Sequence, residues 1–204
     1  MLKLFYTPGT CALATRIALE EAGAEFEIVK VDFSKAEQRS PDYLKVNPKG
    51  RVPALVTDKG TLTETPAILT YIAQTFPDAN LAPLEDAFAL AELQAFNSYI
   101  ASTVHVNHAH GRRGARWANE ESSFADMQGK VSETMAASMQ LIEDQYFEGP
   151  WVMGDQYTVA DPYLFTMTRW LEGDGVDINN YIRLKDHFDR MSARASVQRA
   201  LADA

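Results

Sequence analysis

Patterns typical of β-strands are confined to the first 80 residues of this 204-residue chain. In that segment short apolar runs alternate with helical patterns, and turn residues separate them. From about residue 81 onward only long helical patterns occur, beginning after the linker-like run Ala79–Pro83. We therefore predict an α/β domain over residues 1–80 and an all-α domain over residues 85–204.

The first domain has the predicted element order βαβαββα, which implies a mixed sheet. The expected strands and helices are a strand at 2–6, a helix at 11–22, a strand at 26–31, a short helix at 41–46, a hairpin at 54–63 and a helix at 65–75. Pro8 and Gly9 suit the central positions of a type II turn. Thr65 is expected to cap the last helix, with Pro66 in its first position.

The second domain is predicted to be a helical bundle. Its expected helices cover residues 85–110, 124–147, 159–171 and 180–202. Two apolar stripes at helical spacing favour core packing: Ala89, Leu93, Phe96 and Ile100, and Val131, Met135, Met139, Ile142 and Tyr146. The run Thr158–Asp161 has the pattern of a capping box, with Tyr157 as its hydrophobic staple.

Charge and composition narrow the classes of function. The net charge is −9, of which residues 81–204 carry −8. An acidic surface repels phosphate backbones, which argues against nucleic-acid binding. The longest apolar runs are far shorter than the roughly 20 residues that span a bilayer, and the N-terminus does not resemble a signal peptide. We expect a cytoplasmic protein with no membrane partner.

Cys11 is the only cysteine, and it lies at the expected start of a helix. The partial positive charge of a helix N-terminus lowers the pKa of a thiol, although a buried packing cysteine is an equally plain interpretation. Dithiol chemistry needs a second cysteine three residues on, where this chain has Ala14. A mixed disulfide with a small thiol remains open.

Two short motifs could recognise an extended peptide. Pro53 opens a strand and cannot donate to a ladder, so Val52 would turn its N–H and C=O outward; a plain turn proline is the simpler alternative. Glu64 and Thr65 stand at a helix N-terminus, where free N–H groups suit a carboxylate. A purely structural cap is equally open there.

Histidines gather late in the first long helix of the second domain. His105 and His108 share one face, and His110 lies off that face. A metal site lacks a third ligand in register, so we predict no metal. His105 follows the apolar stripe that ends at Ile100 and is expected to point inward.

These segments together resemble the cytosolic glutathione S-transferases over the whole chain. The resemblance rests on the runs Val46–Leu55, Leu62–Ile68 and Thr158–Asp161, combined with the βαβαββα order and the helical second half. The start, Lys3–Leu13, is similar to the bacterial beta class, which has a cysteine where other classes have Tyr or Ser. The implied fold is a thioredoxin-like N-terminal domain with an all-α C-terminal domain.

The resemblance implies that the protein conjugates reduced glutathione, a cosubstrate and not a prosthetic group, to small hydrophobic electrophiles in detoxification. Glu64 would take the ammonium and Thr65 the carboxylate of the γ-glutamyl end, Val52 the cysteinyl backbone and Lys35 the glycine carboxylate. The implied catalytic residues are Cys11, His105 and Tyr6. The implied glutathione-binding residues are Cys11, Lys35, Arg51, Val52, Pro53, Glu64, Thr65 and His105. The implied acceptor residues are Thr103, Val106, His110, Arg113 and Trp117.

The chain departs from the beta-class pattern in two places. Ala12 replaces the usual Ser after the cysteine, and Ser98, with Asn97 beside it, replaces an asparagine that contacts the partner subunit. The resemblance implies a homodimer through the helices beginning near residues 65 and 85. Two alternatives to conjugation stay open: a glutathione-dependent thiol transferase or reductase using Cys11, and a non-catalytic ligand-binding protein of the same fold.

Overall fold

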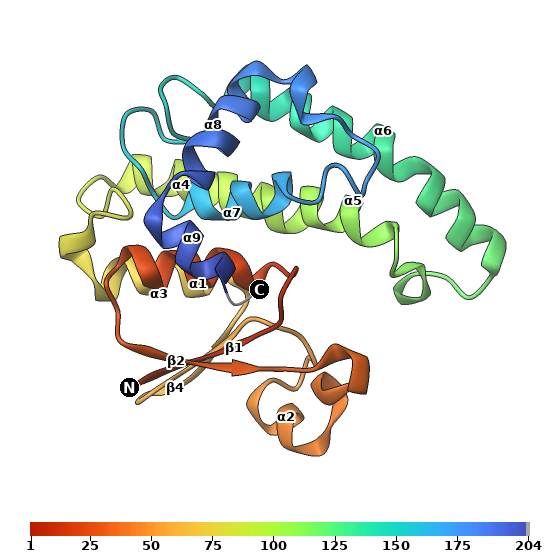
Figure 1. Ribbon diagram of the computed structural model, residues 1–204, viewed down its shortest axis with the longest axis horizontal. Coiled ribbons are helices and arrows are strands. Elements are labelled where there is room, and N and C mark those ends of the chain that lie inside the picture. The colour runs from red at the N-terminus through yellow and green to blue at the C-terminus, as the bar shows by residue number, and fades with distance from the viewer. Residues whose placement is uncertain (203–204) are drawn as a thin grey trace. The chain divides into compact units, whose positions relative to one another are not determined.

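The computed structural model describes residues 1–202, and the chain divides into two compact units (Figure 1). The first contains Met1–Ala91 and the C-terminal segment that begins at Ser192; the second contains Glu92–Met191. The division therefore differs from the one that the sequence patterns indicate, because the last helix packs with the first unit. Nothing in the local pattern of that helix identifies its packing partner.

The first unit is built on a four-stranded mixed sheet in the order β2-β1-β3-β4. β1 pairs parallel with β2 and antiparallel with β3, and β3 pairs antiparallel with β4. The strands are β1 Leu2–Tyr6, β2 Phe26–Lys30, β3 Ala54–Thr57 and β4 Gly60–Thr63. The predicted thioredoxin-like arrangement is confirmed, and β2 ends one residue earlier than expected.

Helices α1 and α3 cover one face of this sheet (Figure 1). The helices of the unit are α1 Ala12–Glu21, α2 Pro41–Val46, α3 Thr65–Thr75 and α9 Ala195–Ala202. Ile17 of α1 and Ile68 and Ile72 of α3 are fully buried. α9 packs against α1.

The carboxylate of Glu21 holds α9 on α1. Glu21 receives hydrogen bonds from the Arg194 guanidinium at 2.6 and 2.7 Å and a short one from the Ser196 hydroxyl. Arg199 pairs with Glu20 at 2.8 Å, and Arg16 donates to the Arg199 carbonyl at 3.2 Å. These bonds span more than 170 residues of sequence and fix the C-terminal helix to the first unit.

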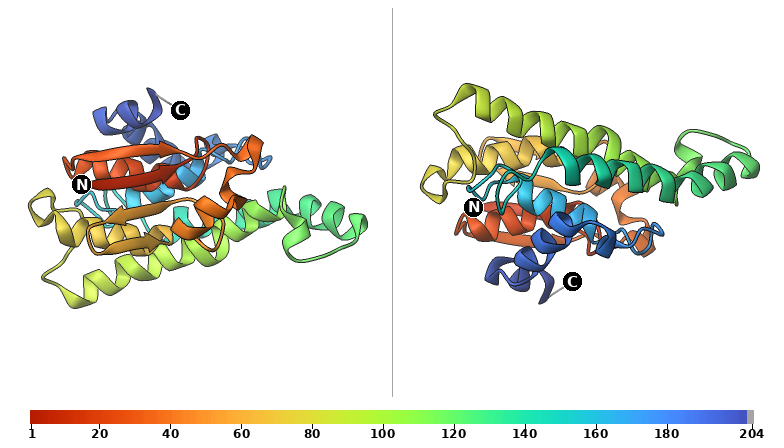
Figure 2. Two further views of the ribbon diagram at one scale, coloured as in Figure 1. Left: turned by 90° about the horizontal axis from the view of Figure 1, so that it is seen from below. Right: turned by 90° about the horizontal axis from the view of Figure 1, so that it is seen from above.

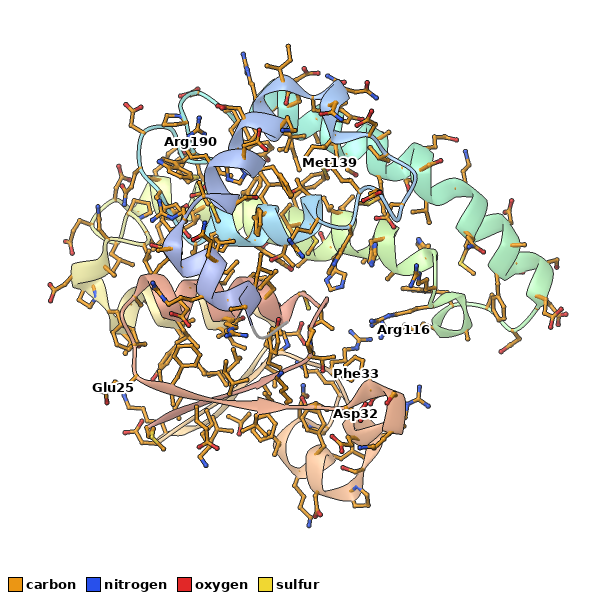
Figure 3. The ribbon with its side chains drawn as sticks, in the orientation of Figure 1. Glu25, Asp32, Phe33, Arg116, Met139 and Arg190 are labelled. Atoms are coloured by element: carbon orange, nitrogen blue, oxygen red, sulfur yellow. The ribbon has the colours of Figure 1, made fainter. Side chains whose placement is uncertain are left out.

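The second unit is helical. α4 Ala87–Tyr99 enters it, followed by α5 His105–His110, α6 Glu121–Gln145, α7 Ala160–Thr168 and α8 Ile182–Ser192. α5 packs on α6 (Figure 2). Leu93 and Phe96 of the first predicted stripe, and Val131 and Met139 of the second, are buried; Met139 lies in the interior of the unit (Figure 3).

Two of the predicted long helices are interrupted. The helix expected over 85–110 has a π-helical turn at Ile100–Val104, and the one expected over 180–202 is two helices, α8 and α9. Neither interruption contains Gly or Pro. The second break lets Arg194 and Ser196 reach Glu21, so a tertiary contact decides it. Among residues 1–202, no helix combines the length and the apolar character needed to cross a membrane.

The capping box before α7 is confirmed. The Thr158 backbone N–H donates to Asp161 Oδ2 at 2.7 Å, and the Thr158 hydroxyl accepts from the Ala160 N–H at 3.3 Å. Asp161 Oδ1 accepts from the Val152 N–H at 2.9 Å and lies 3.1 Å from His187 Nε2. The buried Asp161 carboxylate therefore links the start of α7, the loop before it and α8.

Candidate functional site

Cys11 lies between the turn that follows β1 and the first residue of α1. Gly9 has φ +72°, as a type II turn with glycine in its second central position requires. The Thr7 hydroxyl donates to the Val31 carbonyl at 2.7 Å, which ties the turn to the chain just after β2. Cys11 occupies the cap position of α1 and is half-buried. The predicted placement of the thiol at a helix start is confirmed.

The Cys11 thiol meets the segment before β3. Cys11 Sγ donates to the Val52 carbonyl oxygen at 3.5 Å, across 41 residues of sequence. The Val52-Pro53 peptide bond is cis, and both residues are buried. The Val52 carbonyl thus faces the thiol, and Cys11 and Val52 belong to the same candidate site.

The loop before Val52 is held by buried polar side chains. The Tyr43 hydroxyl and the Asn47 amide nitrogen both donate to the Arg51 carbonyl at 2.6 Å, and the Asn47 amide oxygen accepts from the Lys49 N–H at 3.1 Å. Burial raises the pKa of Tyr43 to about 12, against a smaller opposing hydrogen bond from Asn47. The phenol therefore stays a neutral donor at physiological pH and fixes the backbone next to the cysteine.

Glu64 occupies the cap position of α3 with φ +75°. The expectation that Thr65 caps this helix is wrong: the Ile68 N–H bonds to the Glu64 carbonyl at 3.0 Å, so the helix already includes Thr65. A non-glycine residue at positive φ costs about 1–3 kcal/mol and is concentrated at functional sites. The strained backbone holds an exposed carboxylate beside a buried Thr65.

Lys49 joins the two parts of the site. Its ammonium lies 2.5 Å from Glu64 Oε1 and 3.0 Å from the Thr63 hydroxyl. The loop that positions Val52 and the start of α3 are therefore adjacent. Sequence analysis did not single out Lys49, Asn47 or Tyr43. The run Val46–Leu55, quoted for the resemblance, covers this loop, but it does not show which carbonyl the side chains bind.

The other predicted residues of the first unit lie in different surroundings. Lys35 is exposed on the turn after β2, 3.2 Å from Asp32 (Figure 3 shows Asp32 and its neighbour Phe33). Hydrogen bonds from Ser34 and then Lys35 lower the pKa of Asp32. Tyr6 is completely buried, with the Arg16 guanidinium 5.5 Å from its ring centroid. Packing accounts for the position of Tyr6, and its catalytic role remains a prediction.

The predicted residues of the second unit follow the end of one helix. His105 starts α5 directly after the π-helical turn, and its ring lies 5.3 Å from that of Trp170. His110 packs on Trp117 at 4.4 Å. The predicted acceptor residues are half-buried or exposed: Thr103, Val106, His110, Arg113 and Trp117. Ser98 is exposed and Asn97 is fully buried, so of the two only Ser98 presents its side chain at the surface.

Comparison with known proteins identifies the family to which these two units belong. Residues 1–74 match the family model described as glutathione S-transferase, N-terminal domain, and residues 110–203 match glutathione S-transferase, C-terminal domain. A thioredoxin-like unit with a cysteine at one helix start and an acid at another, followed by a helical unit, therefore defines a protein of the glutathione S-transferase fold.

Relatives that match along nearly the whole chain support the same family. The chain is 34% identical to glutathione S-transferase GstA of Escherichia coli O157:H7, covering 98% of each. It is 49% identical to a glutathione transferase homologue from Sulfitobacter, solved with bound glutathione, at a TM-score of 0.95 over 98% of this chain and 96% of that one. It is 35% identical to the bacterial beta-class enzyme of Sphingomonas chungbukensis, with a TM-score of 0.86 over 98% of each. The chain belongs to the glutathione S-transferase family.

Proposed function

We propose that this protein binds reduced glutathione in its first unit and transfers it to small hydrophobic electrophiles. The observation that carries the proposal is the pair of helix starts: a half-buried thiol against the Val52 carbonyl, and a strained, exposed Glu64 beside a buried Thr65. The cysteinyl backbone pairs with Val52, and the γ-glutamyl ammonium and carboxylate bind Glu64 and Thr65. Lys35 is the proposed contact for the glycine carboxylate, and Arg51 is a further proposed glutathione-binding residue.

The chemistry needs glutathione as a thiolate. The N–H groups at the start of α1 and the positive end of its dipole favour the anion. The glutathione sulfur forms a bond to the electrophilic carbon, and with an aryl halide the halide leaves with the bonding pair. Cys11, Tyr6 and His105 are the proposed catalytic residues, with Thr103, Val106, His110, Arg113 and Trp117 on the acceptor side.

Glu64→Ala tests the site. The ligand ammonium loses a charged hydrogen-bond partner, worth about 1.5–3 kcal/mol, so the KM for glutathione is expected to rise about 10- to 100-fold. Asp42→Ala, which breaks the exposed pair with Lys45 in the same unit, is the control and is expected to leave the KM unchanged. An unchanged KM in Glu64→Ala would contradict the assignment.

Thiol transfer is a second candidate, favoured by the half-buried Cys11 at a helix start. Oxidised glutathione is expected to exchange with the Cys11 thiolate, forming a protein–glutathione disulfide and releasing one reduced glutathione. With no second cysteine the adduct accumulates at one per chain, which mass spectrometry measures. A Cys11 that resists oxidised glutathione and alkylating reagents in the folded protein would be a packing residue.

A homodimer completes the proposal. The start of α4 carries exposed apolar surface, of which Phe88, 74% exposed, is the largest side chain. Closed twofold symmetry is the commonest arrangement for such a surface. Sedimentation at micromolar concentration is expected to give twice the mass of one chain, and Phe88→Asp to lower it; a monomer in both would contradict the dimer. We also propose a cytoplasmic location and a role in detoxification.

A further inference from the structure

The proposed function leaves one charged side chain of the candidate site, that of Lys49, without a role. Lys49 lies in the turn Asn47–Gly50, where the Gly50 N–H donates to the Asn47 carbonyl at 2.9 Å and the Lys49 N–H donates to the Asn47 side-chain oxygen at 3.1 Å. The Lys49 ammonium lies 2.5 Å from Glu64 Oε1 and 3.0 Å from the Thr63 hydroxyl. The backbone of Lys49 is therefore fixed, and its ammonium lies at the carboxylate that we assign to the ligand.

The Lys49–Glu64 pair adds little to the stability of the fold. The two side chains are 46% and 59% exposed, and exposed ion pairs contribute little to stability. The pair joins residues 15 apart in the sequence, and the φ of +75° at Glu64 opposes folding. The exposed pair Lys45–Asp42, in contrast, joins residues three apart within α2. Stability therefore does not account for a cation held at this place.

The Lys49 side chain ends in a primary ammonium, the same chemical group that the proposed function brings to Glu64 in the ligand. A second ammonium must displace Lys49 from Glu64 Oε1 or bind next to another positive charge, and either costs binding free energy. A ligand that also carries a carboxylate offsets this cost, because that carboxylate gives the Lys49 ammonium a new partner. The exposed pair is thus complementary to a zwitterion: its acid suits the ligand's ammonium, and its lysine suits the ligand's carboxylate.

We propose that Lys49 makes the site selective for a zwitterionic α-amino acid end. Its ammonium obstructs Glu64 toward simple amines and binds the α-carboxylate of the γ-glutamyl end together with Thr65. The inference rests on the proposed function, in which Glu64 binds the ammonium of that end. A lysine ammonium has three donors on a flexible stem. Within residues 1–202 two of these donors have acceptors, on Glu64 and Thr63, and the third is left for the ligand.

The experiment compares two ligands that differ only in that carboxylate. One is glutathione. The other is γ-aminobutyryl-cysteinyl-glycine, which keeps the ammonium and the thiol and has a hydrogen atom in place of the α-carboxylate. Isothermal titration calorimetry measures the Kd of each ligand without an electrophile, so the result does not depend on catalysis. The ratio of the two Kd values is the preference of the protein for glutathione.

Lys49→Met removes the ammonium from an exposed position. The analogue is expected to bind this variant about threefold more tightly, because its ammonium no longer competes with Lys49 for Glu64. The preference for glutathione is expected to fall about fivefold, the size of one exposed ion pair, so glutathione itself weakens by less than twofold. Comparing both ligands in both proteins isolates the interaction between Lys49 and the carboxylate. Lys49→Arg, which keeps a cation, is expected to retain most of the preference.

Lys45→Met is the matched control, because it removes the cation of the exposed Lys45–Asp42 pair in the same unit. It changes the net charge by the same amount as Lys49→Met. We expect it to leave both Kd values, and therefore the preference for glutathione, unchanged.

Three results would overturn the proposal: an unchanged preference for glutathione in Lys49→Met, weaker binding of the analogue to that variant, or an equal loss of preference in Lys45→Met, which would show an effect of net charge alone. In each of these the wild-type protein still binds glutathione, so the proposed function stands. Wild-type protein that binds neither ligand would instead contradict the proposed function, and the role of Lys49 would fall with it.

Discussion

Asp161 and Glu64 both stand at the start of a helix, one in each unit, and their surroundings are opposite. Asp161 is completely buried and both of its oxygens accept hydrogen bonds, from Val152 and Thr158, with His187 beside them. The Glu64 side chain is 59% exposed, sits on a backbone with φ +75° and has Lys49 beside it. The first carboxylate holds the helical unit together, and the second is the one that we propose binds the ammonium of glutathione.

The difference shows that the role of an acidic residue at a helix start cannot be inferred from its identity alone. A fully partnered buried acid stabilises the structure because its removal leaves several donors unpaired. An exposed pair such as Lys49–Glu64 contributes little to stability, and the strain at Glu64 opposes it. In the proposed function Glu64 binds the ammonium of glutathione, so the two acids are expected to respond in opposite ways to substitution.

The largest expected effect is at Asp161. Asp161→Ala leaves the Val152 and Thr158 N–H groups and His187 without their acceptor in the core, which is expected to cost about 3–5 kcal/mol of the free energy of unfolding. Urea unfolding measures it. Asp155→Ala, at an exposed position in the preceding loop, is the control. A loss below about 1 kcal/mol would mean that the bonds to Asp161 do not stabilise the unit.

Glu64→Gly sharpens the contrast. Glycine adopts positive φ without the steric cost that a side chain incurs. We therefore expect the free energy of unfolding to rise by about 1 kcal/mol. The same variant removes the carboxylate, so the KM for glutathione is expected to rise about 10- to 100-fold. Higher stability with weaker binding is the expected pair of results. If stability falls, the backbone at Glu64 is not strained.

Glu21 is less buried than Asp161 and less exposed than Glu64. Its substitution is expected to have the smallest effect of the three. Burial raises its pKa, but the hydrogen bonds from Arg194 and Ser196 outweigh burial, and the pKa of Glu21 is lowered from its ordinary 4.5. Because the folded pKa is the lower one, its contribution is complete above pH 4.5 and is lost as the pH falls through the folded pKa.

Glu21→Gln is therefore expected to cost about 1 kcal/mol at pH 7 and to flatten the decline of stability in acid. Urea unfolding at a series of pH values measures both, with Glu25→Gln as a matched exposed control on the same unit. An undiminished acid decline in Glu21→Gln would show that another group causes it.

Local chemistry made much of the first unit predictable. The runs Leu2–Tyr6 and Pro41–Val46 become β1 and α2 with the same bounds, because alternation, prolines and a serine cap act over a few residues. Cys11 at a helix start and the capping box at Thr158–Asp161 follow from the same short-range rules. The resemblance added the roles, which no spacing by itself contains.

Contacts between distant residues decided the rest. The approach of Cys11 to Val52 joins residues 41 apart in the sequence, and the Asp174–His108 pair joins residues 66 apart. The break between α8 and α9 follows the bonds to Glu21. The amino-acid sequence by itself determined the order of the elements and most of the ends in the first unit, because propensity, turn chemistry and capping operate within one turn or strand. Only the tertiary structure decided which carboxylate is buried and which is exposed, because burial depends on what the rest of the chain places around it.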